Sequence, residues 1–142
     1  MPWVIVVFVV CFFTNKSGLP LLPLADWVSY LACAFLAVLG MSLLALGVKA
    51  CPPKVLAGRD RTILVTKGIY SYIRHPICLS CMVLSFSVAM GFKSIIGLIA
   101  AIVVLAIAYL RIVLWEEKEL KHRFGQEYCD YRSKVGMFIP HN

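Results

Sequence analysis

Two short charged clusters stand out in a chain that carries few charges. Arg74-His75-Pro76 immediately precedes one apolar run, and Glu116-Glu117 follows another, with Arg111 about one helical turn before the glutamates. A histidine and a pair of carboxylates are the groups that general acid–base chemistry or the binding of a cationic ligand would use. Arg111 lies within an apolar run, where an ionisable residue is a functional candidate, although it could instead contact a lipid phosphate. These residues are the first candidates for a functional site.

Each cluster also has a structural interpretation that spacing alone does not separate from the functional one. Arg74 and His75 could be residues at the edge of a membrane, and the glutamates could begin a solvated helix. Cys78 and Cys81 form a lone C-x-x-C pair inside an apolar run, and without a second pair no metal site is expected. The placement of the six cysteines is typical of free thiols in a reducing setting.

The composition indicates which elements must position these clusters. Of the 142 residues, 61% are hydrophobic and 15% are charged, and the mean hydropathy is +0.88. A small water-soluble protein could not bury that much apolar surface, and disordered chains have the opposite composition. The formal charge is +7, but the basic residues flank apolar runs and form no continuous stripe. We therefore expect the lipid bilayer, and not nucleic acid, as the partner of one membrane domain over residues 1–142.

Apolar runs predict an all-α integral membrane protein with about four transmembrane helices. A spanning helix needs about 20 apolar residues. The run 2–13 is short, and we interpret it as a shortened or tilted span because it lacks the basic segment and cleavage site of a signal peptide. Lys93-Ser94 leaves so little loop that the last two spans should form a tight hairpin. The predicted spans are 2–13, 27–48, 76–92 and 95–115.

The distribution of Lys and Arg predicts the orientation of these spans. Segments 49–75 and 116–142 carry eleven of these residues, whereas the other two connections carry only Lys16 and Lys93. Basic loops stay in the cytosol. We therefore expect a multi-pass protein of the endoplasmic reticulum or of a bacterial or archaeal inner membrane, with both termini cytosolic. The two charged clusters would then meet on one face of the membrane.

The C-terminal segment has the periodicity of an amphipathic helix. Its apolar and aromatic residues recur at steps of three or four along the chain. They are Leu120, Phe124, Tyr128, Tyr131 and Val135. We therefore expect an amphipathic helix after the last span, whose aromatic stripe packs against lipid or loop.

Two ordered motifs resemble those of a known enzyme family. The stretch LVTKGIYSYIRHP at 64–76 is similar to the L-V-T-x-G-x-Y-x-[YW]-x-R-H-P signature of the isoprenylcysteine carboxyl methyltransferases, which membrane phospholipid methyltransferases largely share. Residues 116–131 resemble the family's E-E-x-x-L-x-x-x-F-G-x-E-Y-x-x-Y ending, and the similarity covers roughly residues 40–140. The resemblance implies a membrane enzyme that binds S-adenosylmethionine without a Rossmann domain, in a pocket formed by the cytosolic loop and the C-terminal amphipathic helix.

The resemblance also assigns residues to that pocket. Cys78 stands where the family has the Tyr of R-H-P-x-Y, so one aromatic contact is lost unless Tyr70 or Tyr72 supplies it. Eukaryotic members place a substrate-binding Arg at the position of Ile112, and here Arg111 lies one residue away. The cofactor-binding residues implied are Thr62, Ile63, Leu64, Val65, Tyr70, His75, Pro76, Cys78, Glu116 and Glu117.

The expected reaction is methyl transfer to an amphipathic prenylated or lipid substrate. A carboxylate acceptor is already ionised and needs only a cation such as Arg111 to hold it. An amine acceptor must first lose a proton, for which His75 or Glu117 is the candidate base. We expect an S-adenosylmethionine-dependent carboxyl O-methyltransferase acting on the C-terminal carboxylate of an isoprenylcysteine. The alternatives are N-methylation of a phospholipid head-group amine and a non-catalytic membrane scaffold.

Overall fold

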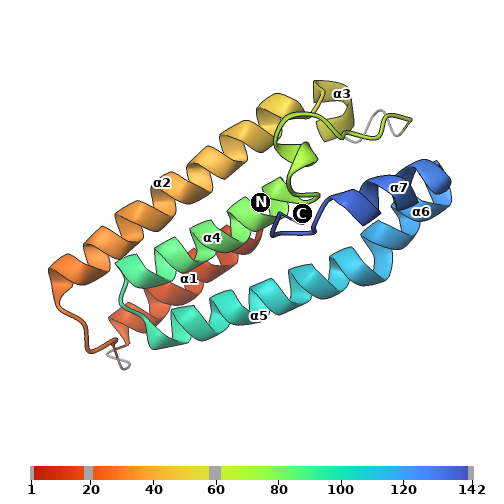
Figure 1. Cartoon of the computed structure of the whole chain (residues 1–142). Coiled ribbons are helices and arrows are strands. Elements are labelled where there is room, and N and C mark those ends of the chain that lie inside the picture. The colour runs from red at the N-terminus through yellow and green to blue at the C-terminus, as the bar shows by residue number, and fades with distance from the viewer. Residues whose placement is uncertain (1, 18–20, 58–61, 141–142) are drawn as a thin grey trace. The chain divides into compact units, whose positions relative to one another are not determined.

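Helices make up the described parts of the chain, as the sequence predicts. The computed structural model describes residues 2–17, 21–57 and 62–140, and within these ranges extended segments pair only in isolated bridges (Figure 1). Arg59 and Arg61, which contribute to the predicted orientation, lie outside the described residues. The elements are α1 (Pro2–Lys16), α2 (Asp26–Ala50), α3 (Pro53–Leu56), the 3₁₀ helix η1 (Gly68–Ser71), α4 (Pro76–Gly91), α5 (Ile95–Arg111), the π-helical turn η2 (Ile112–Glu116), α6 (Glu117–Phe124) and α7 (Gln126–Lys134).

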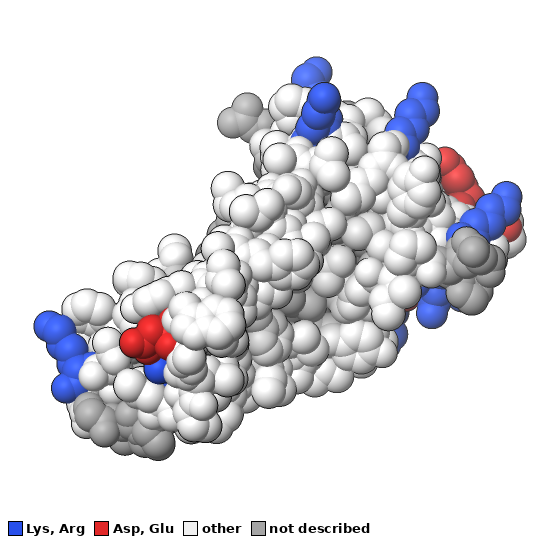
Figure 2. Space-filling model, turned by 60° about the vertical axis from the view of Figure 1, so that its left-hand side comes forward, with Lys and Arg blue, Asp and Glu red and all other residues white. Residues whose placement is uncertain are grey.

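Helices α1, α2, α4 and α5 occupy the predicted apolar runs. Among the described residues, α2 and the continuous helix Ile95–Phe124 are long and apolar enough to cross a membrane, whereas α1 and α4 are shorter. The charged residues of α2 stand at its two ends, Asp26 and Lys49. Phe35 and Val38, between them, are 69% and 68% exposed. Figure 2 shows one face of the molecule, on which a large area carries no Lys, Arg, Asp or Glu. A surface of this kind fits lipid better than water.

The described chain forms two compact units. The first comprises residues 1–42 and 80–108, and the second comprises residues 43–79 and 109–142. In the first unit, buried Val7, Cys11, Ala89 and Val104 form an apolar core. The second unit contains both charged clusters and every element that surrounds them.

Small residues allow close helix packing in the first unit. A Cβ atom added to Gly97 would lie 2.3 Å from Cys11 Sγ, so α5 approaches α1 closely. Between α4 and α2, the Ser87 hydroxyl donates to the Cys33 carbonyl oxygen at 2.9 Å. Small residues and such interhelical hydrogen bonds are typical of helix pairs in membranes.

The second unit is built from short elements joined by tight turns. Proline at 52 and 53 ends α2 and begins α3. Residues 63–66 have no regular secondary structure and lead into η1 at Gly68, whose φ of +64° suits glycine. The predicted single C-terminal helix is wrong, because Gly125 has a φ of +56° and separates α6 from α7. The stripe from Leu120 to Val135 is therefore distributed over two helices and the residue that follows them.

Candidate functional site

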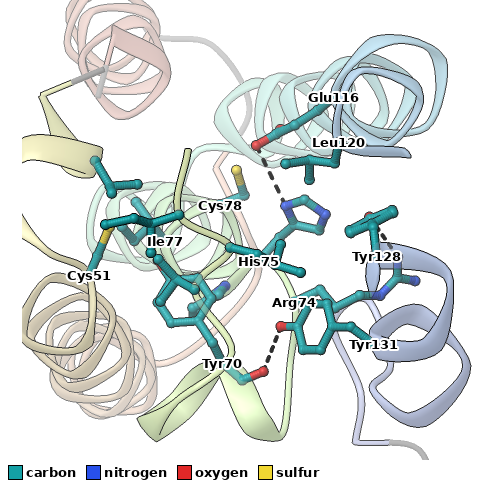
Figure 3. A pocket seen from close by; sticks show the side chains of 15 residues that line it. Cys51, Tyr70, Arg74, His75, Ile77, Cys78, Glu116, Leu120, Tyr128 and Tyr131 are labelled. Carbon is teal, nitrogen blue, oxygen red and sulfur yellow. Dashed lines mark hydrogen bonds and ion pairs between the residues drawn. The ribbon is translucent and has the colours of Figure 1, made fainter. Parts of the chain in front are cut away.

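A cavity of about 300 Å³ lies in the second unit (Figure 3). Its walls come from the residue after α2, α3, residues 63–65, η1, residues 74–75, the start of α4, the end of η2, α6 and α7. This volume is at the lower end of the range of small-molecule sites. The lining residues are Cys51, Val55, Ile63, Leu64, Val65, Tyr70, Arg74, His75, Pro76, Ile77, Cys78, Glu116, Leu120, Tyr128 and Tyr131.

Most of the residues that the sequence assigns to a cofactor pocket line this one cavity. They are Ile63, Leu64, Val65, Tyr70, His75, Pro76, Cys78 and Glu116. The predicted residues Thr62, Arg111 and Glu117 are not among the lining residues. Tyr70 lines the cavity together with Cys78, whereas Tyr72 is 66% exposed and lies elsewhere. Of the two tyrosines proposed to replace the family's aromatic contact, Tyr70 is therefore the better placed.

The side chains of His75 and Glu116 lie next to one another in the wall of the cavity. The imidazole Nδ1 lies 3.7 Å from Glu116 Oε1, and the side chain of His75 is only 5% exposed (Figure 3). Its Nε2 is buried and has no hydrogen-bond partner within the described part of the chain. Burial, together with the positive charge of Arg74, lowers the pKa of His75 to about 4. At neutral pH the imidazole of His75 is therefore uncharged, and its Nε2 lies 3.9 Å from Glu117 Oε1, beyond hydrogen-bond distance.

Arg74 lies beside His75 and connects several segments. Its Nε donates to the Val135 carbonyl oxygen at 2.9 Å, and its Nη1 donates to the Tyr128 hydroxyl at 3.2 Å and to Glu117. Its backbone N–H donates to the Gly136 carbonyl oxygen at 2.9 Å. The guanidinium therefore joins the start of α4 to α6, α7 and the residues after α7.

Three tyrosines supply phenol groups around the cavity. The Tyr131 hydroxyl donates to the Tyr70 carbonyl oxygen at 2.6 Å and fixes α7 against η1 (Figure 3). Burial raises the pKa of Tyr131 to about 12 and also raises the pKa values of Tyr70 and Tyr128. These phenols therefore remain protonated and act as neutral hydrogen-bonding groups at physiological pH.

Sequence reasoning did not assign several features of the site. Arg74 appeared only as a motif residue or an interface residue, and Tyr128 and Tyr131 appeared only as members of an apolar stripe. Cys51 and Val55 carry no motif signal, and only the fold brings them to the cavity. The π-helical turn η2 also had no sequence signal. Such turns are rare and often occur at functional sites.

The remaining predicted residue, Arg111, ends α5 and has an exposed side chain. It is close enough to interact electrostatically with Glu116. Within the described residues, no group of three or more His, Cys, Asp or Glu side chains could hold a metal ion.

Comparison with known proteins agrees with the two motifs. The sequence model of the phospholipid methyltransferase family matches residues 27–127. The chain belongs to this family. It is also similar to protein-S-isoprenylcysteine O-methyltransferases, which confirms the resemblance predicted from the motifs.

The curated relatives are longer than this chain. The Tribolium castaneum isoprenylcysteine methyltransferase is 31% identical over 78 residues, which cover 55% of this chain and 28% of the relative. The Saccharomyces cerevisiae enzyme is 33% identical over 78 residues, covering 55% and 33%. The cobalt-zinc-cadmium resistance protein CzcN of Cupriavidus metallidurans is 32% identical over 118 residues, covering 80% and 51%. The chain therefore spans about half or less of the length of these relatives.

Proposed function

We propose that this chain transfers the methyl group of S-adenosylmethionine to a lipid-attached carboxylate of the isoprenylcysteine type. The observation that carries the proposal is the buried imidazole of His75. It lines the cavity beside Glu116 and keeps one ring nitrogen without a hydrogen-bond partner in the described residues. A buried polar atom without a partner costs free energy unless a ligand satisfies it. Similarity to isoprenylcysteine methyltransferases supports the reaction class.

The cavity lining fits the proposed methyl donor. S-adenosylmethionine carries its methyl group on a positively charged sulfonium. A nucleophile attacks the methyl carbon in line with the carbon–sulfur bond that breaks. Glu116 offers a negative charge that complements the sulfonium, and His75 Nε2 offers a hydrogen bond. Leu64, Val65 and Pro76 offer apolar contact that excludes water. Holding the reactants in line is the main contribution that these residues can make, worth about 7–11 kcal/mol in favourable cases.

The electrostatics of His75 favour a carboxylate acceptor. An ammonium group has a pKa near 10, whereas burial and Arg74 lower the pKa of His75 to about 4. An imidazole with so low a pKa is a poor base for deprotonating an ammonium. A carboxylate acceptor requires no base. Arg111, exposed at the end of α5 and electrostatically coupled to Glu116, is the cation proposed to hold it.

A second candidate function is N-methylation of a phospholipid head-group amine. The observation in its favour is the match of residues 27–127 to the phospholipid methyltransferase family. In that reaction a cation beside the acceptor would be unfavourable, and Arg111 would instead face a lipid phosphate. The two functions therefore differ in the role of Arg111.

Methyl transfer by the purified protein distinguishes these functions. Detergent-solubilised protein is incubated with isotopically labelled S-adenosylmethionine and either a farnesylcysteine analogue or phosphatidylethanolamine, and products are identified by mass spectrometry. We expect label in the farnesylcysteine methyl ester, and a strong loss of that product in Arg111→Lys, which cannot reproduce the guanidinium geometry. Label only in the amine lipid, unaffected by Arg111→Lys, would support the second function. Binding of the donor without transfer to either acceptor would support a non-catalytic scaffold.

We also propose that α1, α2, α4 and α5 all cross the membrane, with segments 49–75 and 116–142 in the cytosol. Support comes from the distribution of Lys and Arg and from the aromatic residues near helix ends, Trp27 and Tyr30 on α2 and Tyr109 on α5. Cysteine substitutions at Lys67, Lys121, Lys16 and Lys93, probed in intact cells with an impermeant thiol reagent, test this topology in a background without other reactive thiols. Labelling at position 121 from outside would contradict it.

A further inference from the structure

Arg74, which lines the cavity, forms a buried ion pair with Glu117, which does not. The Arg74 side chain is 8% exposed, and that of Glu117 is 4% exposed. Arg74 Nη1 contacts Glu117 Oε1, while Arg132 Nη1 lies 3.5 Å from Glu117 Oε2. Both oxygens of this carboxylate therefore already face protein cations. Glu117 has little capacity left to bind a ligand directly.

The sequence places this pair immediately beside the two polar residues that face the cavity. His75 follows Arg74, and Glu116 precedes Glu117, so the His75–Glu116 contact and the Arg74–Glu117 contact join the same two segments. Because the paired residues are adjacent in the sequence, a movement of either segment would change both contacts. The separation of these two segments therefore sets both the ion pair and the Nδ1–Oε1 distance of 3.7 Å between His75 and Glu116.

Arg74 also fixes the wall contributed by α7. Its contacts with the Tyr128 hydroxyl and the Val135 carbonyl oxygen reach the first turn of α7 and the residue after its end. The backbone N–H groups of Arg74 and His75 donate to the carbonyl oxygens of Gly136 and Met137. A single side chain thus holds α6, α7 and the following segment against the start of α4.

We propose that Arg74 and Glu117 are positioning residues, which set the spacing of His75 and Glu116 and hold α7 as a wall of the donor cavity. This inference rests on the proposed function, because the cavity is taken to hold S-adenosylmethionine. It differs from the role implied by the family motif, in which Glu117 contacts the cofactor or acts as a base. Here Glu117 acts on the ligand through the residues that it contacts, Arg74 and His75, whose Nε2 lies 3.9 Å from Glu117 Oε1.

A double-mutant cycle separates the two roles. Calorimetry measures the affinity of the full chain in detergent for S-adenosylhomocysteine, with the variants Glu117→Gln, Arg74→Gln and the double variant. We expect each single variant to weaken binding at least about tenfold and the double variant to be no weaker than the worse single one, because residues acting through one contact are not additive. Independent losses that multiply in the double variant would show that Glu117 contacts the ligand itself and would overturn the proposal.

Amide hydrogen exchange provides a readout that needs no ligand. We expect both single variants to speed exchange across residues 126–137, with the double variant no faster than the faster single one. If the wild type binds no S-adenosylhomocysteine, the proposed function fails. The exchange rates still show whether Arg74 and Glu117 hold α7 and the residues after it in place. Unchanged exchange in Glu117→Gln would overturn the positioning role even in a chain that binds the ligand.

Arg132→Gln is a milder variant for the case in which loss of the buried pair unfolds the protein. Arg132 is 54% exposed and does not line the cavity. We expect roughly a two- to fivefold loss of affinity and faster exchange across 126–137, since a partly exposed ion pair contributes modestly. Arg123→Gln, which removes the exposed partner of Glu119, is the matched control and should change neither quantity. Equal effects of Arg132→Gln and Arg123→Gln would count against the proposal.

Discussion

The two units of this chain are stabilised by different kinds of contact. In the first unit, small residues let helices approach closely, as at Gly97 and Cys11, and hydroxyl groups supply hydrogen bonds between segments. Its ion pair between Lys93 and Asp26 involves an exposed carboxylate at the start of α2. In the second unit, an arginine and a buried glutamate join short helices to extended segments. Shape complementarity suffices where helices only have to pack. A site that must hold a polar ligand requires directional, charged contacts, and these are sensitive to single changes.

The largest effect is expected from breaking the buried ion pair. Arg74→Met leaves the Glu117 carboxylate without its main partner, and losing one partner of a buried pair costs about 3–5 kcal/mol. The free energy of unfolding in detergent measures this loss. In Arg123→Met, which breaks the more exposed Glu119–Arg123 pair, the expected loss is about 0.5 kcal/mol or less. Similar losses in the two variants would mean that burial does not set the importance of ion pairs in this unit.

A second prediction concerns pH and should affect mainly the second unit. His75 has a pKa of about 4 in the folded protein, compared with an ordinary value of 6.5. The unfolded chain therefore binds a proton more readily, so the stabilisation is complete above pH 6.5 and is lost as the pH falls toward 4. The gap between the two pKa values corresponds to roughly 3 kcal/mol.

Amide hydrogen exchange, measured across this pH range and corrected for the pH dependence of the intrinsic exchange rate, tests the prediction segment by segment. We expect protection to fall between pH 6.5 and 4 in segments 68–79 and 116–137, and less so in residues 80–108. His75→Gln removes the titrating group and leaves Arg74, Glu116 and Glu117 in place, so its remaining pH dependence measures their contribution. An identical loss of protection in the variant would assign the effect to the carboxylates.

The first unit, which depends on apolar helix packing, is easier to predict from the sequence than the second, which depends on charged contacts. The apolar runs identify α1, α2, α4 and α5 because a long hydrophobic helix depends on composition alone. The two motifs identify much of the cavity lining, including His75, Tyr70 and Glu116. The direction of Glu117 could not be predicted, since adjacent helical residues point about 100° apart and the π-helical turn before it changes the register. The break at Gly125 was missed because the apolar spacing continues across it.

A third prediction addresses packing in the first unit. Gly97→Ala would place a Cβ atom 2.3 Å from Cys11 Sγ, and such overpacking costs about 1–3 kcal/mol. The free energy of unfolding should fall by this amount, and less in Gly91→Ala, where the corresponding distance to Cys33 Sγ is 3.0 Å. Adding Cys11→Ala removes the clashing sulfur and should recover part of the stability. If it recovers none, the cost of Gly97→Ala does not arise from the contact with α1.

The smallest expected loss of stability comes from removing a single hydroxyl, and each unit offers one for comparison. Tyr131→Phe removes the hydroxyl that donates to the Tyr70 carbonyl oxygen and leaves that acceptor in a partly buried place. Ser87→Ala removes the hydroxyl that donates from α4 to the Cys33 carbonyl oxygen on α2. A hydrogen bond within a soluble protein contributes about 1 kcal/mol to the free energy of unfolding. Hydrogen bonds between transmembrane helices contribute about 0.6 kcal/mol on average.

We therefore expect Tyr131→Phe to lower the free energy of unfolding slightly more than Ser87→Ala, and their effects on the cavity to differ more clearly. Tyr131 joins α7 to η1, so its loss should speed amide exchange at residues 68–73 and weaken S-adenosylhomocysteine binding a few-fold. Ser87 joins two apolar helices outside the second unit, and its loss should leave both quantities unchanged. If Ser87→Ala weakened ligand binding as much as Tyr131→Phe, packing of the apolar helices would also have to shape the cavity, and the division of roles between the units would no longer hold.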